Sequence, residues 1–369
     1  MNLYDDGLLA QLDAKFSAER ERNAAILPYI ARDGRYRTDM RQENLSWWTN
    51  GFWAGLLWQM YRATGDEGYR TVAQQTETWL DEALARFTGL HHDVGFMWRL
   101  SAVADHTLTG SEVSRTRALH AATLLAGRFN PNGRFLRAWN QDKTGWMIVD
   151  CLMNLSLLYW ASEQTGDPRF AQIAAAHADT ALRVLARPDG SCAHIAILNP
   201  ETGDLLETPA GQGYAPGSSW SRGQSWAVYG FAISARHTGE ARYLDAARRA
   251  AHYFIANVAE TGWVSRVDFR APAEPVYWDT TATAIAAAGL LELADLAAEA
   301  ERPFYRTAAE RMLQALLDGQ CDFDPARDGL LQNGTAAYSH PDTHLPIIYG
   351  DYFLTEALLR FQDRGFRAW

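Results

Sequence analysis

The chain has 369 residues, of which 47% are hydrophobic and 21% charged, a composition typical of a globular protein with a large core. No segment approaches the roughly 20 uninterrupted apolar residues that a transmembrane helix needs. The formal net charge of −10 argues against a nucleic acid as partner, because its phosphates would be repelled. No basic amphipathic helix is visible, so we also expect no binding to a membrane surface.

The cysteines and the N-terminus bear on the compartment. Cys151, Cys192 and Cys321 are odd in number and form no CxxC pair, so we expect free thiols and no zinc held by cysteines. The first ten residues lack the basic and then apolar pattern of a secretory signal. If Met1 is the natural start, the expected location is cytoplasmic.

In chain order, the sequence shows helical periodicity with a recurring turn, and no succession of strands. A Thr-Gly pair joins one apolar helical segment to the next at Gly65, Gly110, Gly166 and Gly239. Glycine suits the left-handed residue after a helix, and a following Asp or Ser suits the cap of the next helix. Four helix pairs are therefore predicted: Asn50–Ala63 with Glu67–Arg86, Gly95–Leu108 with Glu112–Arg128, Cys151–Gln164 with Arg169–Arg187, and Gln224–His237 with Ala241–Val258.

Two further pairs complete the predicted set. Thr280–Glu299 pairs with Phe304–Asp318, and the last helix, Asp351–Gln362, is expected to pack against an N-terminal helix at Gly7–Arg22. The first helix of each pair is the more apolar, as expected for an inner ring surrounded by an outer one. Six such pairs close a toroid, so the predicted fold is an all-α (α/α)6 barrel that forms one domain over residues 1–369.

An open α-solenoid with a protein-binding concave face is the alternative architecture. The repeats have unequal lengths, and a long non-helical insertion runs from Asp189 to Ser221. Both features argue against a regular solenoid.

Unusual polar and aromatic clusters lie at or just before the start of each predicted inner helix. They are Trp47–Trp53, His91–Phe96, Ile148–Cys151, Ser218–Gln224, Tyr277–Thr280 and Ile348–Asp351. In a ring of parallel inner helices these six starts form one rim. The free N–H groups and partial positive charge of helix N-termini favour an anionic ligand there, and 14 tryptophans are consistent with a carbohydrate pocket.

Asp93 and Asp150 are the candidate catalytic carboxylates. Asp150 is flanked by apolar residues on both sides, so it is expected to be desolvated, which raises a carboxyl pKa as a general acid requires. A second carboxylate nearby would raise this pKa further. Asp279 and Asp351 are interpreted as helix caps, the commoner role of aspartate at a helix start.

Two groups of residues offer side chains of the metal-binding kind: His91 with His92 and Asp93, and His340 with Asp342 and His344. Adjacent side chains are expected to diverge, and prolines interrupt any helix that would align the second group. No HExxH motif, phosphate loop or Gly-x-Ser-x-Gly elbow is present. We therefore expect no metal and no cofactor.

Several of these motifs together resemble glycoside hydrolase family 88, the unsaturated glucuronyl hydrolases. They are Trp48–Trp53, His92–Phe96, Asp150–Leu155, Trp220–Trp226 and Tyr349–Phe353, within a match from about Trp47 to Arg360. The resemblance implies an (α/α)6 barrel that acts on oligosaccharides left by polysaccharide lyases and removes a 4,5-unsaturated uronic acid from their non-reducing end. It implies hydration of the C4=C5 enol ether: a proton goes to C4, water adds at C5, and the resulting hemiketal opens.

The resemblance also implies roles for individual residues. Asp150 matches the general acid and base, and Asp93 the second essential carboxylate, which would stabilise positive charge at C5. The expected sugar contacts are aromatic at Trp48, Trp139 and Trp226, and polar at Asn50, His194, Gln212 and Arg222. We expect Arg222 to bind the substrate carboxylate, because a guanidinium can bind two oxygens at once.

Three departures from the family pattern concern the leaving sugar and sulfate tolerance. Gly211 stands where some relatives have a histidine, and Trp146 where a relative has an arginine. The family's sulfate-binding serine and lysine pattern is not visible between Tyr338 and Pro346. These changes leave the expected chemistry unaffected.

Three other readings stay open at this point. The unsaturated rhamnogalacturonyl hydrolases share barrel and chemistry but act on pectin fragments. A sugar epimerase on the same barrel would use a histidine pair, which fits two aspartates at separate helix starts poorly. A non-catalytic carbohydrate-binding barrel would not need Asp150. The sequence leaves the oligomeric state open.

Overall fold

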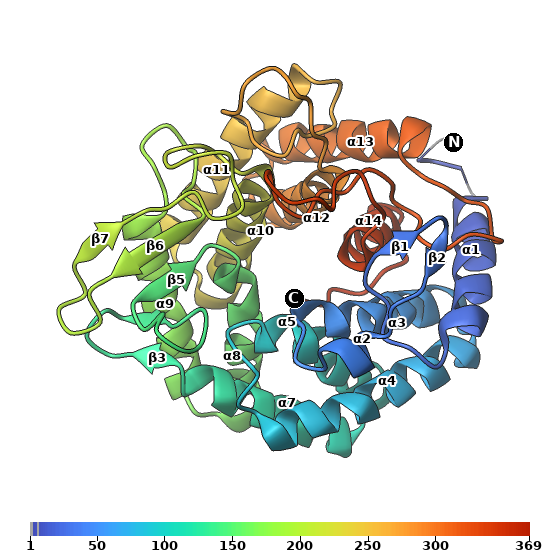
Figure 1. Cartoon of the computed structure of the whole chain (residues 1–369), viewed down its shortest axis with the longest axis horizontal. Coiled ribbons are helices and arrows are strands. Elements are labelled where there is room, and N and C mark those ends of the chain that lie inside the picture. The colour runs from blue at the N-terminus through green and yellow to red at the C-terminus, as the bar shows by residue number, and fades with distance from the viewer. Residues whose placement is uncertain (1–2, 6) are drawn as a thin grey trace.

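The computed structural model describes residues 3–5 and 7–369, and these residues form two concentric rings of helices (Figure 1). The inner ring consists of α3 (Phe52–Thr64), α5 (Val94–Trp98) with α6 (Ala104–Thr109), α8 (Cys151–Thr165), α10 (Ser221–Thr238), α12 (Thr280–Leu296) and α14 (Ile348–Phe361). The outer ring consists of α1 (Leu8–Asn23), α4 (Glu67–Arg86), α7 (Glu112–Ala126), α9 (Arg169–Val184), α11 (Ala241–Ala259) and α13 (Arg302–Gly319). The predicted (α/α)6 barrel is thus confirmed. A short helix, α2 (Met40–Glu43), precedes α3.

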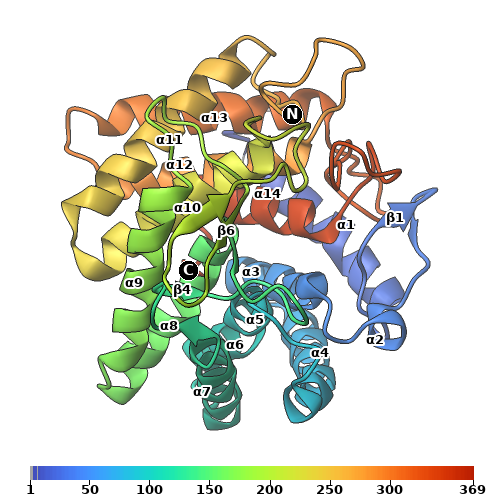
Figure 2. The same cartoon turned by 60° about the vertical axis from the view of Figure 1, so that its left-hand side comes forward.

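Burial separates the two rings as the sequence predicts. Every residue of α12 from Thr280 to Ala294 is buried, whereas α11 buries one face and exposes the other. The outer helices α4, α7 and α9 stand side by side around the barrel (Figure 2). An inner helix surrounded by protein needs apolar and small residues all round, and an outer helix needs them on one stripe.

The Thr-Gly turns end inner helices as predicted. Gly65, Gly110, Gly166 and Gly239 follow α3, α6, α8 and α10 with φ between 69° and 77°, the left-handed region that glycine enters without steric cost. Each turn reverses the chain from the inner to the outer ring.

The structure differs from the prediction in several helices. The expected helix Gly95–Leu108 contains a π-helical segment, Arg99–Val103, between α5 and α6. Helix α1 completes the outer ring, but it packs against α3 and α4 rather than mainly against α14.

Helix α14 begins at Ile348, so Asp351 lies inside it. Its carboxylate accepts the N–H groups of Leu330 and Leu331, at 3.1 and 2.7 Å, and its interpretation as a cap is wrong.

Short antiparallel strands, which the sequence did not predict, occur in the loops of the described residues. They are β1 (Ala31–Arg32) with β2 (Arg35–Tyr36), β3 (Phe129–Asn130) with β4 (Phe135–Leu136), and the sheet of β5 (Trp146–Ile148), β6 (Ile195–Leu198) and β7 (Leu205–Glu207). Ile148 pairs with Ile195, and the Val149 N–H donates to the His194 carbonyl at 3.0 Å. This pairing places Asp150 next to His194.

The C-terminal ends of three inner helices carry an ion-pair network. Arg236, Arg360 and Arg367 surround the carboxylate of Glu292, which is 1% exposed. Burial alone would raise the pKa of Glu292, but these three arginines outweigh it and hold that pKa below its usual range.

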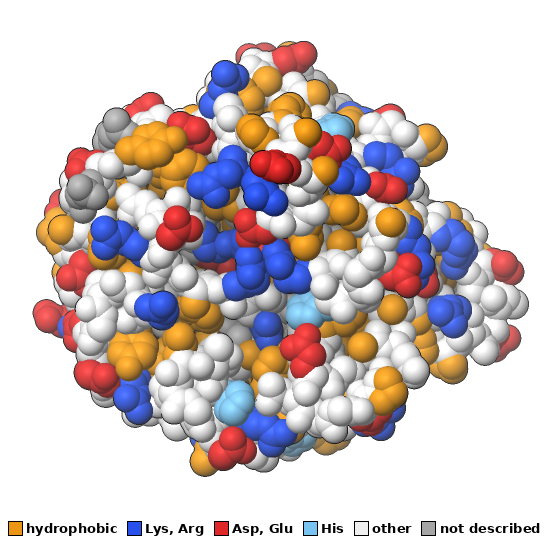
Figure 3. Space-filling model, turned by 180° about the vertical axis from the view of Figure 1, so that it is seen from behind, with side chains coloured by type: hydrophobic (Ala, Val, Ile, Leu, Met, Phe, Trp, Pro, Cys, Tyr) orange, Lys and Arg blue, Asp and Glu red, His pale blue; other side chains and the backbone are white. Residues whose placement is uncertain are grey.

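Figure 3 shows the face opposite to that of Figure 1, on which Lys and Arg side chains gather near the middle. Among the described residues, no helix is long and apolar enough to cross a membrane.

Candidate active site

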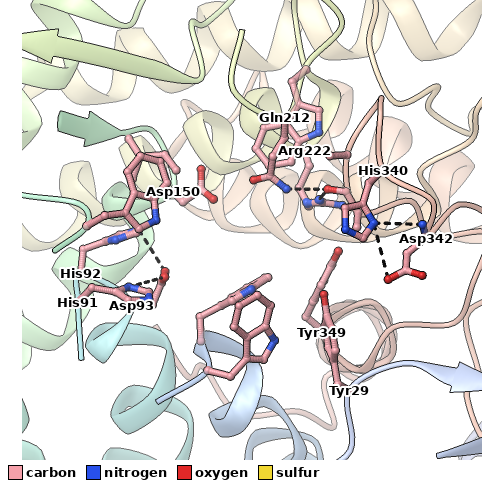
Figure 4. Close-up of a pocket in the computed structure, with 17 residues that line it drawn as sticks. Tyr29, His91, His92, Asp93, Asp150, Gln212, Arg222, His340, Asp342 and Tyr349 are labelled. Carbon is pink, nitrogen blue, oxygen red and sulfur yellow. Dashed lines mark hydrogen bonds and ion pairs between the residues drawn. The ribbon is translucent and has the colours of Figure 1, made fainter. Parts of the chain in front are cut away.

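A cavity of about 420 Å³ opens at the N-terminal ends of the inner helices (Figure 4). It has the size of a small-molecule site. Its lining residues are Tyr29, Trp47, Trp48, His91, His92, Asp93, Trp139, Ile148, Asp150, Gln212, Trp220, Arg222, Ala336, Ala337, His340, Asp342 and Tyr349. The starts of α3, α5, α8, α10 and α14 contribute as predicted from the sequence, whereas the predicted cluster Tyr277–Thr280 at the start of α12 is not among the lining residues.

Asp150 lies between β5 and α8 with its side chain in this cavity. The nearest basic group is the His194 ring, whose Nε2 is 3.7 Å from Oδ1, and within the described chain this oxygen has no hydrogen-bond partner. Burial raises the pKa of Asp150 to about 8, and the nearby charge of Asp93 adds to the rise. The carboxyl group is therefore protonated at neutral pH and can act as an acid.

Asp93 lies directly before α5 and has the opposite electrostatic environment. Its Oδ2 is 3.0 Å from Nδ1 of His91, and its Oδ1 is 3.2 Å from Nε2 of His92. Burial alone would raise the pKa of Asp93, but the two rings outweigh it and hold that pKa below its usual range. When one of two carboxyl groups in a pocket has a raised pKa and the other a lowered pKa, the first typically acts as the acid and the second stays ionised and stabilises positive charge.

A close contact between α5 and α8 brings the two carboxylates together. The side chain of Asn154, one turn into α8, accepts the Phe96 N–H at 2.6 Å. A Cβ on Gly95 would lie 2.4 Å from the Asn154 Cα, so only glycine permits this approach. The glycine in the His92–Phe96 motif thus has a packing role that fixes the site.

The guanidinium of Arg222, which was expected to bind the substrate carboxylate, is instead bound by protein groups. Its Nη1 donates to Asp279 Oδ2 at 2.7 Å and to the Thr335 carbonyl at 2.8 Å, and its Nη2 donates to the Ala336 carbonyl. Much of the guanidinium is thus engaged by protein, which leaves little of it to grip a substrate carboxylate. Asp279 makes no side-chain capping bond to α12 and instead pairs with Arg222, so its interpretation as a cap is wrong.

The other predicted sugar contacts divide into two groups. Trp48, Trp139 and Gln212 line the cavity. Trp226 and Asn50 do not belong to its lining: Trp226 is 0% exposed and packs between aromatic rings of the core, and the Asn50 amide donates to backbone carbonyls just before α3. Their expected direct contact with sugar is therefore corrected to a supporting position.

His194 is also outside the lining residues but contacts one of them. Its Nδ1 accepts the Gln212 N–H at 2.9 Å, so the proton of the neutral ring is on Nε2, the atom that faces Asp150. Burial lowers the pKa of His194 to about 3, which keeps the ring neutral.

Gly211 has φ +61°, and a Cβ there would lie 2.0 Å from His194 Nδ1. This backbone has no room for a histidine at position 211.

Several lining residues had no assigned role in the sequence analysis. Tyr29, Trp47 and Trp220 add aromatic surface, and His340 with Asp342 lies at the opposite side of the cavity from Asp93 (Figure 4). Trp47 and Trp220 belong to the motifs at helix starts, so their position was within reach of the sequence. Tyr29 and His340 lie on loops whose approach to the barrel depends on contacts far along the chain.

The His91, His92 and Asp93 side chains converge, contrary to the sequence expectation that adjacent side chains diverge. One ligand atom from each lies within 4.8 Å of the other two. The chain bends at Asp93, the residue before α5, so that the two rings and the carboxylate point into the same cavity.

Comparison with known proteins identifies the family of the chain. The chain is 42% identical to the unsaturated glucuronyl hydrolase of Bacillus sp. (strain GL1) over 330 residues, which cover 86% of each protein. The solved structure of the Bacillus sp. GL1 unsaturated glucuronyl hydrolase, described as responsible for the degradation of glycosaminoglycan, superposes with a TM-score of 0.90 at 38% identity over 96% of this chain and 95% of that one. An unsaturated chondroitin disaccharide hydrolase of Streptococcus pyogenes serotype M1 is 33% identical over 85% of this chain and 81% of its own. The model of Glycosyl Hydrolase Family 88 matches residues 28–353, and the chain therefore belongs to that family.

Proposed function

We propose that the cavity releases a 4,5-unsaturated uronic acid from the non-reducing end of oligosaccharides produced by polysaccharide lyases. The observation that carries this proposal is the pair Asp93 and Asp150, which share one cavity and have pKa values displaced in opposite directions. Membership of glycoside hydrolase family 88 supports the same reaction class.

The reaction begins with the protonated carboxyl of Asp150. Asp150 gives its proton to C4, the C4=C5 electron pair forms the new C4–H bond, and positive charge develops at C5 and the ring oxygen. The ionised Asp93 stabilises this charge from the same cavity. Water then adds at C5 and returns a proton to Asp150, and the hemiketal opens to release the remaining saccharide.

The cavity wall suits a sugar that carries a carboxylate. We place the sugar faces against Trp48 and Trp139, and polar groups at Gln212. Arg222 contributes positive charge to the cavity lining, and its ion pair with Asp279 fixes the position of the guanidinium. His194 directs its Nε2–H towards Asp150 and holds the Gln212 backbone, and Asn50 and Trp226 support the wall from behind.

Replacing Asp150 tests the proposal directly. Asp150→Asn keeps the size of the side chain but cannot donate or accept the proton, so turnover of an unsaturated uronyl disaccharide should be abolished. The assay follows the loss of the ultraviolet absorbance of the conjugated C4=C5 bond. Asp204→Asn, an exposed aspartate outside the cavity, is the matched control and should retain the wild-type rate. A near-normal rate in Asp150→Asn would refute the mechanism.

The substrate class is tested with a panel of lyase products from chondroitin, hyaluronan, heparin, gellan, xanthan and pectin. Turnover of a glucuronyl product supports the proposal, whereas turnover of the pectin fragment alone would favour an unsaturated rhamnogalacturonyl hydrolase. If the wild-type protein bleached none of them, the proposed activity would be wrong.

We also propose that residues 1–369 form one catalytic domain that works in the cytoplasm. Residues 1, 2 and 6 of that range lie outside the described structure. The thiols of Cys151, Cys192 and Cys321 are free, which suits a reducing compartment.

A further inference from the structure

We propose that His91, His92 and Asp93 form a binding site for a zinc-like divalent cation, and that the bound cation blocks the active site. This inference goes beyond the proposed hydrolysis, which needs no metal. The site lies on one wall of the cavity, with the three side chains facing one another (Figure 4).

The hydrogen bonding of His92 leaves one ring nitrogen available as a ligand. Its Nδ1 is 2.9 Å from the Ala138 carbonyl oxygen, which can only accept, so Nδ1 carries the proton. The lone pair is then on Nε2, the atom that faces Asp93. A backbone carbonyl that holds the other ring nitrogen is the common arrangement behind a metal-binding histidine.

The distances around Asp93 suit a small cation. Its two oxygens lie 3.0 Å from His91 Nδ1 and 3.2 Å from His92 Nε2. Ligands of a tetrahedral zinc ion, each about 2.0–2.1 Å from the metal, are separated by about 3.3 Å. One potential ligand atom from each of the three residues lies within 4.8 Å of the other two.

Without a cation, the ring nitrogens of His91 and His92 that face Asp93 lack well-aligned hydrogen-bond partners in the described structure. His91 Nδ1 and His92 Nε2 are buried, and within the described structure neither is aligned as a hydrogen-bond donor or acceptor. His92 Nε2 and an oxygen of the ionised Asp93 lie 3.2 Å apart, so a cation between them would be bound by both. Two imidazoles and one carboxylate match the ligand preference of zinc, and the fourth position opens into the cavity.

The test measures binding without substrate, so its outcome is independent of the hydrolase activity. Protein freed of metal by a chelator is titrated calorimetrically with ZnCl₂ at pH 7.5, and we expect one saturable ion per chain. His91→Ala should weaken this binding at least about tenfold. His340→Ala is the matched control, because His340 lines the same cavity but, within the described structure, belongs to no group of three potential metal ligands, and it should bind zinc as the wild type does.

Cobalt provides a second measurement that reports the ligands themselves. Co²⁺ bound by imidazole nitrogens absorbs visible light more strongly than the hydrated ion, and this absorbance should appear in the wild type and be lost in His91→Ala. The proposal is overturned if the wild type shows no saturable site, if His91→Ala binds like the wild type, or if His340→Ala abolishes binding.

The inhibitory part rests on the proposed function. Zn²⁺ should inhibit cleavage of the unsaturated disaccharide competitively, and a chelator should restore the rate. Zinc that binds at the expected stoichiometry but leaves the rate unchanged would refute the blocking role. Zinc binding to a protein that cleaves no unsaturated disaccharide would instead refute the proposed function and leave the metal site in place.

Discussion

The pH dependence of the reaction tests the raised pKa of Asp150. This pKa is about 8 because the carboxyl is buried and faces the charge of Asp93. The protonated form is the active one, so activity is lost as pH rises. The protonated fraction of such a group falls from about 0.9 at pH 7 to about 0.1 at pH 9. We therefore expect kcat/KM to drop about tenfold over that interval, and about tenfold more for each further pH unit.

The measurement uses initial rates of C4=C5 bleaching at substrate concentrations well below KM, so that the profile reports the free enzyme. Returning each sample to pH 7 and assaying it again separates titration from irreversible unfolding. The reasoning would be refuted by a profile that is flat between pH 7 and 9, or by a basic limb with a midpoint below pH 6, where an ordinary carboxyl would place it.

The remaining predictions concern stability and binding. The pKa of Asp150 is raised in the folded protein, so the stability that its protonated form contributes is present below the unfolded pKa and is lost as pH rises through about 8. Asp150→Asn should therefore melt at a higher temperature than the wild type at pH 9, with a smaller difference at pH 4. Equal melting temperatures by circular dichroism at pH 9 would contradict this prediction. Glu292→Gln removes the carboxylate that three arginines share, and urea unfolding at pH 7 should show a loss of about 3 kcal/mol. Since the pKa of Glu292 is lowered, its contribution exists above the unfolded pKa and is lost on acidification, so the variant and the wild type should converge towards pH 3. Trp226→Ala leaves a cavity in the fully buried core and should lower the free energy of unfolding by about 3–5 kcal/mol. Trp139→Ala, at the cavity wall, should leave stability nearly unchanged and raise KM by up to about tenfold. The reverse pattern would show that the two tryptophans are assigned to the wrong roles.

The barrel was predictable because its signals are local. Hydrophobic periodicity and the Thr-Gly turns depend on residues within one or two helices, and the outer helix Glu67–Arg86 was predicted with its observed ends. Some predicted helix starts were wrong at helices that begin without a capping side chain. Helix α10 begins at Ser221 instead of Gln224, because the chain approaching it is held by strand-like bonds to Val267 rather than by a cap.

The candidate site was predictable only in part, for a physical reason. Asp93 and Asp150 each lie in a motif next to a helix start, so the ring architecture brings them to one rim. The partner of Arg222 is Asp279, 57 positions away in the sequence, and periodicity carries no information about such pairs. The same holds for the loop contacts that place Tyr29 and His340 in the cavity wall.

The two candidate carboxylates also show how a catalytic aspartate differs from a capping one at the same position of a helix. Asp66 caps α4 by accepting the Gly68 N–H at 2.7 Å, and its bonds to Arg20 and to this N–H hold its pKa below the usual range. Asp150 also precedes a helix, but it makes no side-chain bond to the helix N–H groups. A capping bond stabilises the ionised form and would prevent proton donation at neutral pH. An acid at a helix start must therefore turn away from the free N–H groups, and Asp150 gains its raised pKa because burial and the charge of Asp93 outweigh the positive helix end.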